Sequence, residues 1–220
     1  MQRTLVLDLD GTLVDSVPDL RASLNRLMAM RGLAGFDAPE VAAMVGDGAA
    51  VLVQRAMTAR GRRAEAADIG DFLADYGAHP AVESRPFAGV AETLPRLRSD
   101  GWRLAVCTNK PEAPARSLLG ALRLLDMIDA IGGGDSFPVR KPDPAHLLAT
   151  IARAGGNPAA SVMVGDHHND VRAASGAGIP CVFALWGYGP IAMAEGSQAR
   201  AERFADVPAI AAGLISPSAR

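Results

Sequence analysis

After residue 85, the sequence alternates short apolar runs with segments whose apolar residues have helical spacing. Neighbouring parallel strands need a crossover connection, usually a helix, so this alternation is typical of a mostly parallel sheet with helices on both faces. The pattern predicts an α/β, Rossmann-like architecture. Strands are predicted at Arg103–Thr108, Ala130–Gly132, Val162–Val164 and Cys181–Leu185, and helices at Val90–Arg98, Glu112–Leu122, Pro144–Ala154, Val171–Gly176 and Val207–Leu214.

Another apolar strand, Thr4–Leu9, precedes a long stretch that has helical patterns and no convincing strand. Helices are predicted in this stretch from Pro18 to Gly32, after Asp37, and at Ala49–Arg60 and Ala64–Gly77. A Pro/Gly connection at residues 85–89 then leads into the alternating region. The economical interpretation is an α/β core formed by residues 1–15 and 85–220, interrupted by an all-helical insertion of residues 16–84.

The composition and net charge argue against some classes of binding partner. With 49% hydrophobic residues the chain can bury a sizeable core, and a net charge of -2 gives no electrostatic reason to expect nucleic acid or an anionic membrane. No apolar run approaches the roughly 18 residues of a membrane-spanning helix, and the N-terminus lacks a signal-peptide pattern. We therefore expect a cytoplasmic protein that binds neither nucleic acid nor membrane. The two cysteines, Cys107 and Cys181, lie inside apolar runs and are interpreted as core residues.

Polar side chains follow three of the predicted strands at the point where each strand ends. In an open parallel sheet, ligands bind beyond the carboxyl ends of the strands, so these residues form the candidate site. They are Asp8, Asp10, Gly11 and Thr12 at the end of the first strand, Thr108, Asn109 and Lys110 at the end of the second, and Asp166 and Asp170 after the fourth, with Lys141 at the start of a predicted helix.

Asp8 and Asp10 are two residues apart and can project from the same side of one strand. Carboxylates that close raise each other's pKa unless a cation lies between them. Asp8 could be a nucleophile toward phosphorus that forms an aspartyl-phosphate, while Asp10 could give a proton to the departing oxygen and later take one from water. Gly11 would leave backbone N–H groups free to approach phosphate oxygens. The simpler alternative is a polar strand end that forms turn hydrogen bonds.

Asp166 and Asp170, taken alone, could be no more than helix caps. Together with Asp8 they would supply the hard oxygen ligands that suit Mg²⁺ rather than zinc. Such a metal would relieve the repulsion between the carboxylates and let Asp8 approach an anionic phosphate. His167 and His168 are interpreted as loop residues and not as transition-metal ligands, because carboxylates surround them and no cysteine is nearby.

Thr108 and Lys141 are the candidates for holding a phosphoryl group. The Thr108 hydroxyl and the amides after it could bind phosphate oxygens, and the compact positive charge of Lys141 could hold the aspartyl-phosphate in line. Each also has a plain structural interpretation: Thr108 finishes a strand, and Lys141 is a solvated residue at a helix start. Lys110 is equally compatible with the surface and with substrate contact.

Four motifs fall in order over nearly the whole length: Asp8-Leu9-Asp10-Gly11-Thr12-Leu13, Thr108, Lys141 in Lys-Pro-Asp-Pro, and Gly165-Asp166 with Asp170. In these motifs the chain resembles the haloacid dehalogenase-like hydrolases, in the subgroup with a helical cap domain inserted after the first strand. The resemblance implies a Mg²⁺-dependent phosphatase with Asp8 as nucleophile and Asp10 as acid/base. It also implies that Asp166 and the backbone carbonyl of Asp10 bind the metal, with Asp170 supporting.

Further stretches are similar to the phosphoglycolate phosphatases of this superfamily: Gly46-Asp47-Gly48-Ala49, Thr108-Asn109-Lys110-Pro111 and Gly132-Gly133-Gly134-Asp135. They imply a small phosphorylated metabolite, 2-phosphoglycolate, as substrate, with Gly46 and Gly48 in the cap loop that contacts it. One departure is His167, because relatives usually have Ser or Thr after the Gly-Asp pair.

Other functions use related chemistry and stay open. They include a phosphatase of the same superfamily acting on pyrophosphate, a nucleotide or a sugar phosphate, and a phosphomutase, although the arginine-serine cap stretch of the mutases is not found. From a different class, a non-catalytic phosphate-binding protein or a receiver-like signalling module also fits some of the residues, but a receiver would leave the helical insertion unexplained. We expect a monomer or a homodimer.

Overall fold

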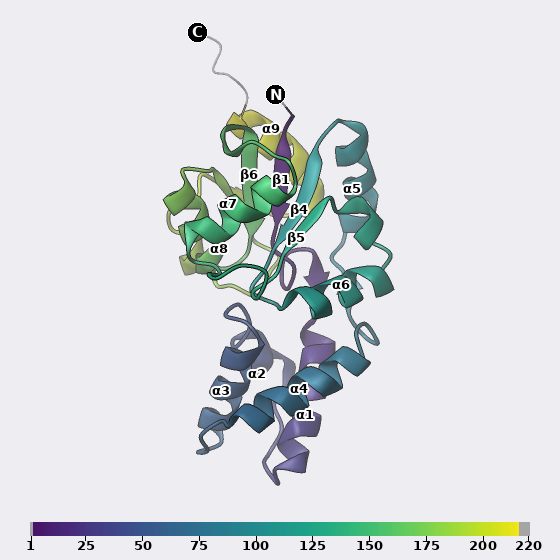
Figure 1. Ribbon diagram of the computed structural model, residues 1–220, viewed down its shortest axis with the longest axis vertical. Coiled ribbons are helices and arrows are strands. Elements are labelled where there is room, and N and C mark those ends of the chain that lie inside the picture. The colour runs from purple at the N-terminus through teal and green to yellow at the C-terminus, as the bar shows by residue number, and fades with distance from the viewer. Residues whose placement is uncertain (1, 216–220) are drawn as a thin grey trace.

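The computed structural model describes residues 2–215, in which a six-stranded parallel sheet forms the centre of the larger part of the molecule (Figure 1). Strand β1 lies in the middle of this sheet, between β4 and β6, and every one of its residues is buried. In sheet order the strands are β5 (Ala130–Gly132), β4 (Arg103–Cys107), β1 (Thr4–Leu7), β6 (Ser161–Gly165), β7 (Cys181–Ala184) and β8 (Ala199–Ala201).

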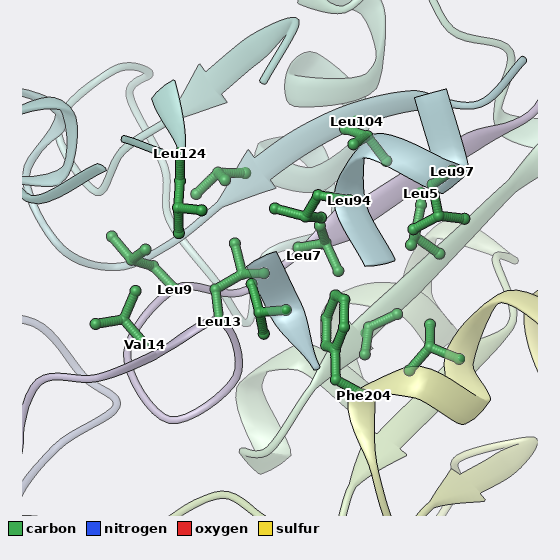
Figure 2. Close-up of a cluster of buried hydrophobic side chains, with 14 of the residues drawn as sticks. Leu5, Leu7, Leu9, Leu13, Val14, Leu94, Leu97, Leu104, Leu124 and Phe204 are labelled. Atoms are coloured by element: carbon green, nitrogen blue, oxygen red, sulfur yellow. The ribbon is translucent and has the colours of Figure 1, made fainter. Parts of the chain in front are cut away.

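The alternation of side chains along β1 divides the apolar core between the two faces of the sheet. Leu5 and Leu7 pack in a cluster with Leu94, Leu97 and Phe204 (Figure 2). This cluster is covered by helices α5 (Val90–Ser99), α6 (Glu112–Ala121) and α9 (Val207–Ile215). Val6 belongs to a second cluster, covered by α7 (Pro144–Arg153) and α8 (His168–Ala177). The predicted mostly parallel sheet with helices on both faces is therefore confirmed.

The remaining helices lie together at the end of the molecule toward which β1 runs (Figure 1). They have an apolar cluster of their own, which includes Leu24, Met28, Val53 and Phe72. Because the carboxyl end of β1 faces them, any site at this sheet edge is covered by the helical segment. Its helices are α1 (Val17–Met30), α2 (Ala38–Ala42), α3 (Ala49–Ala59) and α4 (Ala66–Ala78).

Three features differ from the sequence-based expectations. The predicted connection at residues 85–89 contains β3 (Arg85–Pro86), which pairs antiparallel with β2 (Val14–Asp15), so the two chain crossings into the helical segment are hydrogen-bonded to each other. Strand β8 was not expected. Helix α8 begins at His168, three residues before the prediction. Short 3₁₀ turns complete the described chain at Leu125–Met127, Pro158–Ala160, Ile191–Ala194 and Phe204–Asp206.

Candidate active site

The turn after β1 brings the chain close to the acidic residues that follow β6. Strand β1 ends at Leu7, two residues before the prediction, and the Leu9 carbonyl accepts the backbone N–H groups of Leu13 and Val14 at 3.0 Å each. Gly11 has φ +87°, and a Cβ at this position would overlap the Asp166 carboxylate. Glycine is required here on both counts, because a side chain would be strained by the backbone and would displace Asp166.

Asp8, Asp166 and Asp170 form a buried acidic cluster, with one carboxylate oxygen from each lying within 4.8 Å of the others. Burial raises the pKa of Asp8 to about 6, and the Asp170 charge adds to this, while Lys141 opposes it. Burial together with the charges of Asp8 and Asp170 raises the pKa of Asp166 to about 7. The cluster has an excess of negative charge, and its ligand atoms are hard oxygens. These residues fit a bound divalent cation such as Mg²⁺.

Lys141 is the cation that already stands in this cluster. Its Nζ lies 2.6 Å from Asp170 Oδ1 and 2.9 Å from Asp8 Oδ1, and its side chain is 1% exposed. Burial by itself would lower the pKa of Lys141, but the Asp170 and Asp8 carboxylates raise it overall, so the ammonium stays charged. The second Asp170 oxygen accepts the backbone N–H of His167 at 3.0 Å. Asp170 therefore fixes Lys141 beside Asp8.

Asp10 lies apart from the acidic cluster and has a lysine of its own. Both of its carboxylate oxygens are 3.1 Å from Lys110 Nζ, and the Ser16 hydroxyl donates to Asp10 Oδ1 at 2.6 Å. Asp8 and Asp10 are thus each compensated by a separate ammonium, Lys141 and Lys110. A cation close to the two aspartates was predicted from the sequence; the structure adds an ammonium beside each of them, since the strand ends before Asp8 and the chain turns between them.

The residues after β4 connect the sheet to the helical segment. Asn109 donates from Nδ2 to the carbonyls of Gly46 and Lys141, at 3.0 Å each. The Thr108 hydroxyl is almost fully buried and accepts the Lys110 backbone N–H at 3.2 Å. A Cβ on Gly48 would lie 2.8 Å from the Asn109 carbonyl oxygen. The loop between α2 and α3 therefore rests directly on the end of β4.

A cavity lies between this loop and the end of the sheet. Of the candidate site residues, seven line it: Asp8, Asp10, Gly46, Gly48, Thr108, Asn109 and Lys110. Thr12 does not, because its side chain is buried and its hydroxyl donates to Asp166 Oδ1 at 2.8 Å. Thr12, a candidate phosphate or substrate residue in the sequence, thus uses its side chain to contact the acidic cluster and not the cavity. Lys141, Asp166 and Asp170 do not line the cavity themselves but lie beside Asp8, which does, and Gly11 lies against Asp166.

Two residues of the site were missed from the sequence. Tyr188 was not among the candidate site residues, yet its backbone N–H donates to Asp166 Oδ2 at 2.9 Å. The glycines on either side, Gly187 and Gly189, approach Asp166 so closely that a Cβ on either would overlap it. Ser16 was missed because a serine at a helix start is ordinary. The glycine flanks of Tyr188 were the available signal.

His167 caps helix α8. Its Nδ1 accepts the Asn169 backbone N–H at 3.3 Å, and the Asp170 side chain accepts its own N–H. Burial lowers the pKa of His167 to about 4, so the ring is neutral and can accept this hydrogen bond. The histidine thus forms the N-terminal hydrogen bond of a helix that a Ser or Thr forms elsewhere.

Comparisons with known proteins agree with this geometry. The family model of the haloacid dehalogenase-like hydrolases matches residues 2–178. The chain belongs to this family. This hydrolase is 44% identical over 194 residues to a phosphoglycolate phosphatase of Agrobacterium fabrum, with 86% of this chain and 83% of the relative covered. It is 43% identical over 196 residues to the enzyme of that name from Rhodospirillum rubrum, covering 86% and 81%.

The fold also matches solved structures. A predicted phosphoglycolate phosphatase from Haemophilus somnus superposes with a TM-score of 0.87 and 33% identity, over 94% of this chain and 97% of that one. The helices of residues 2–215 include none with the length and apolarity needed to span a membrane.

Proposed function

We propose that this hydrolase is a Mg²⁺-dependent phosphomonoesterase that works through an aspartyl-phosphate on Asp8, with 2-phosphoglycolate as its substrate. The observation that carries the proposal is the position of Asp8, which lines the cavity on one side and contacts Lys141 and the acidic cluster on the other. A carboxylate with this surrounding can attack an anionic phosphoryl group because the positive charges behind it offset the repulsion.

In the first step an Asp8 oxygen attacks the phosphorus, and the bond from phosphorus to the ester oxygen breaks. Asp10 gives a proton to the departing oxygen, which leaves as the hydroxyl of glycolate. In the second step water attacks the aspartyl-phosphate, Asp10 takes the water proton, and inorganic phosphate leaves while the Asp8 carboxylate re-forms. Lys141 stays charged throughout and holds the phosphoryl oxygens beside Asp8.

Mg²⁺ would be held by the carboxylates of Asp8 and Asp166 and by the Asp10 backbone carbonyl, with Asp170 supporting. When bound, it supplies charge stabilisation to the transferring phosphoryl group. Thr108 would bind a remaining phosphate oxygen. The Gly11 backbone N–H, which was expected from the sequence to be free for phosphate, instead donates to the Val14 carbonyl at 3.0 Å.

The proposed substrate rests on the two relatives, whose names give phosphoglycolate as what they act on. The loop with Gly46 and Gly48 and the facing side chains would read the carboxylate end of this substrate, since they form the cavity wall opposite the phosphate side. Closure of the helical segment over the site would exclude water from the first step.

The test is the release of inorganic phosphate from a panel of small phosphomonoesters, with Mg²⁺ and after its removal by a chelator. We expect release only with Mg²⁺ and a kcat/KM for 2-phosphoglycolate at least about tenfold above those for sugar phosphates, nucleotides and pyrophosphate. Release that is unaffected by the chelator, or none from any compound, would contradict the proposal. A preference for another compound would contradict 2-phosphoglycolate as the substrate but would not contradict the proposed hydrolase mechanism.

A further inference from the structure

The chain has 22 basic residues besides histidine, and only two of them, Lys110 and Lys141, are lysines. Both are buried at the candidate site, with exposures of 6% and 2%. A lysine is a compact point charge with three donors, whereas an arginine is a wide planar fork. Lys141 is accounted for by its position beside Asp8 and Asp170. Lys110 compensates Asp10, but the proposed chemistry assigns it no contact with the substrate.

Lys110 is the one cationic side chain that lines the cavity within residues 2–215. Its two described hydrogen bonds both go to the Asp10 carboxylate, and its Nζ stands 4.4 Å from the centroid of the Tyr76 ring. Burial would lower the pKa of Lys110, but the charge of Asp10 and the contact with Tyr76 raise it overall. The ammonium therefore favours its charged form, and it faces the Tyr76 ring of the helical segment.

The wall that the helical segment contributes is otherwise apolar. It consists of Leu20, Val45, Ala49, Leu52, Phe72 and Leu73, together with glycines and Tyr76. The Tyr76 side chain is 2% exposed, and its hydroxyl contacts the Lys110 ammonium but forms no well-oriented hydrogen bond with any described residue. A buried hydroxyl without a partner is costly, and a cavity-lining one can recover that cost by bonding to a ligand.

We propose that the Lys110 ammonium and the Tyr76 hydroxyl together bind the carboxylate of the substrate, and so select a short phosphorylated carboxylic acid over a neutral phosphomonoester. This inference rests on the proposed function, and it names the residues that read the end of the substrate remote from phosphorus. The carboxylate would take the ammonium donor that Asp10 leaves free, and it would accept the Tyr76 O–H.

Charge and size support this assignment over other occupants. An apolar wall gives no compensation to a second phosphate group or to a string of hydroxyls, so bisphosphates and sugars would leave polar groups unpaired against Leu52 and Phe72. A single carboxylate, in contrast, can accept hydrogen bonds from both the Lys110 ammonium and the Tyr76 hydroxyl. Because this site is desolvated, the charge-assisted hydrogen bonds it forms are stronger than they would be in water.

The experiment compares kcat/KM for 2-phosphoglycolate with that for ethyl phosphate, in which a methyl group replaces the carboxylate. The wild-type ratio should be large, and Lys110→Met should lower it by about 10- to 100-fold, the effect of one charge-assisted hydrogen bond. Tyr76→Phe should lower it by about three- to tenfold, because only a neutral donor is lost. Arg140→Met is the matched control: it removes a positive charge beside Gly48 from a residue outside the cavity lining, and it should leave the ratio unchanged.

A binding measurement with non-hydrolysable ligands tests the same inference without turnover, and the use of several variants means that it does not depend on the folding of any one of them. Calorimetry would compare the affinity for 3-phosphonopropionate, which has a carboxylate, with that for propylphosphonate, which has a methyl group instead. Wild type and Lys110→Arg should bind 3-phosphonopropionate more tightly. This preference should be lost in Lys110→Met and reduced in Tyr76→Phe. An unchanged ratio in both Lys110→Met and Tyr76→Phe, or a wild type with no preference for the carboxylate, would overturn the inference. Failure of wild type to hydrolyse either ester would instead overturn the proposed function.

Discussion

Tyr188 and Asp15 are joined by a hydrogen bond of 2.8 Å between the phenol and Asp15 Oδ1, across 173 positions of sequence. The same phenol oxygen accepts the backbone N–H groups of Ser16 and Val17, at 2.8 Å and 3.2 Å. Burial and the nearby Asp15 charge raise the pKa of the Tyr188 hydroxyl, so it keeps its proton. Since its backbone N–H donates to Asp166, Tyr188 links the acidic cluster to the point where the chain enters the helical segment.

Replacing Tyr188 with Phe should therefore destabilise this junction. The change leaves the Asp15 carboxylate and two backbone N–H groups without their partner, and we expect the free energy of unfolding to fall by about 1–3 kcal/mol. Amide hydrogen exchange at Ser16 and Val17 should accelerate. Urea unfolding and exchange measured by mass spectrometry check both effects.

Tyr76→Phe is the matched control for this prediction, because it removes the same atom from a buried tyrosine whose hydroxyl has no well-oriented partner. Its free energy of unfolding should not fall, because no well-oriented hydrogen bond is lost with this hydroxyl. Equal destabilisation by the two substitutions would show that the Tyr188 hydrogen bonds do not stabilise the protein.

The Tyr188 contacts also show where the sequence is uninformative. Periodicity and the strand-end rule located Asp8, Thr108 and Asp166 at one edge of the sheet, because an apolar strand and its last polar residue are local signals. Tyr188 acts through a hydrogen bond to a residue 173 positions away, and no local pattern encodes that distance.

Short elements were missed for a related reason. Strands β2 and β3 have two residues each, too few for a period to be detected, and they pair with each other across about 70 positions of sequence, which no local pattern shows. Likewise, the separate pairing of Asp10 with Lys110 depends on a turn that shortens the expected strand by two residues, which a strand pattern does not reveal.

Asp8→Asn should retain the fold and abolish turnover. An amide is a far poorer nucleophile than a carboxylate, so phosphate release should fall by at least about 10³-fold. Circular dichroism should be unchanged, since Lys141 keeps its contact with Asp170. Near-normal Mg²⁺-dependent activity in this variant would refute the assignment of Asp8 as the nucleophile.

Mg²⁺ should raise the thermal stability of this hydrolase by binding the acidic cluster. A ligand that binds only the folded state stabilises it by about 2.7 kcal/mol when present at a hundred times its Kd. Asp166→Asn removes one negative charge and one ligand oxygen from the cluster, so the Mg²⁺-dependent rise in Tm should shrink or vanish.

The control for the metal experiment is Asp206→Asn, which removes a carboxylate from a surface ion pair with Arg203. Its Tm should respond to Mg²⁺ as wild type does, as measured by calorimetry with the metal and with a chelator. An identical response of Asp166→Asn and wild type would place the metal elsewhere.

Asp19 should stabilise the protein in a pH-dependent way through its contacts with the end of the helical segment. Its carboxylate accepts the Glu83 and Ser84 backbone N–H groups at 2.9 and 2.8 Å and the Ser84 hydroxyl at 2.6 Å. Burial acts to raise the pKa of Asp19, but these hydrogen bonds outweigh it and hold the pKa below its usual value. The folded state thus prefers the ionised carboxylate, which contributes stability above an unfolded pKa of about 3.9 and loses that contribution as the pH falls through the folded pKa.

Asp19→Asn tests this directly. At neutral pH it should lower the free energy of unfolding by about 1–3 kcal/mol, because an amide can accept only part of these hydrogen bonds. Urea unfolding of wild type and variant from pH 7 down to about pH 3 should show the difference shrinking at the acid end, below the ordinary pKa of an aspartate. Other carboxylates titrate in both proteins and cancel in the difference. A difference that stays constant over the whole range would mean that Asp19 acts through packing and not through its charge.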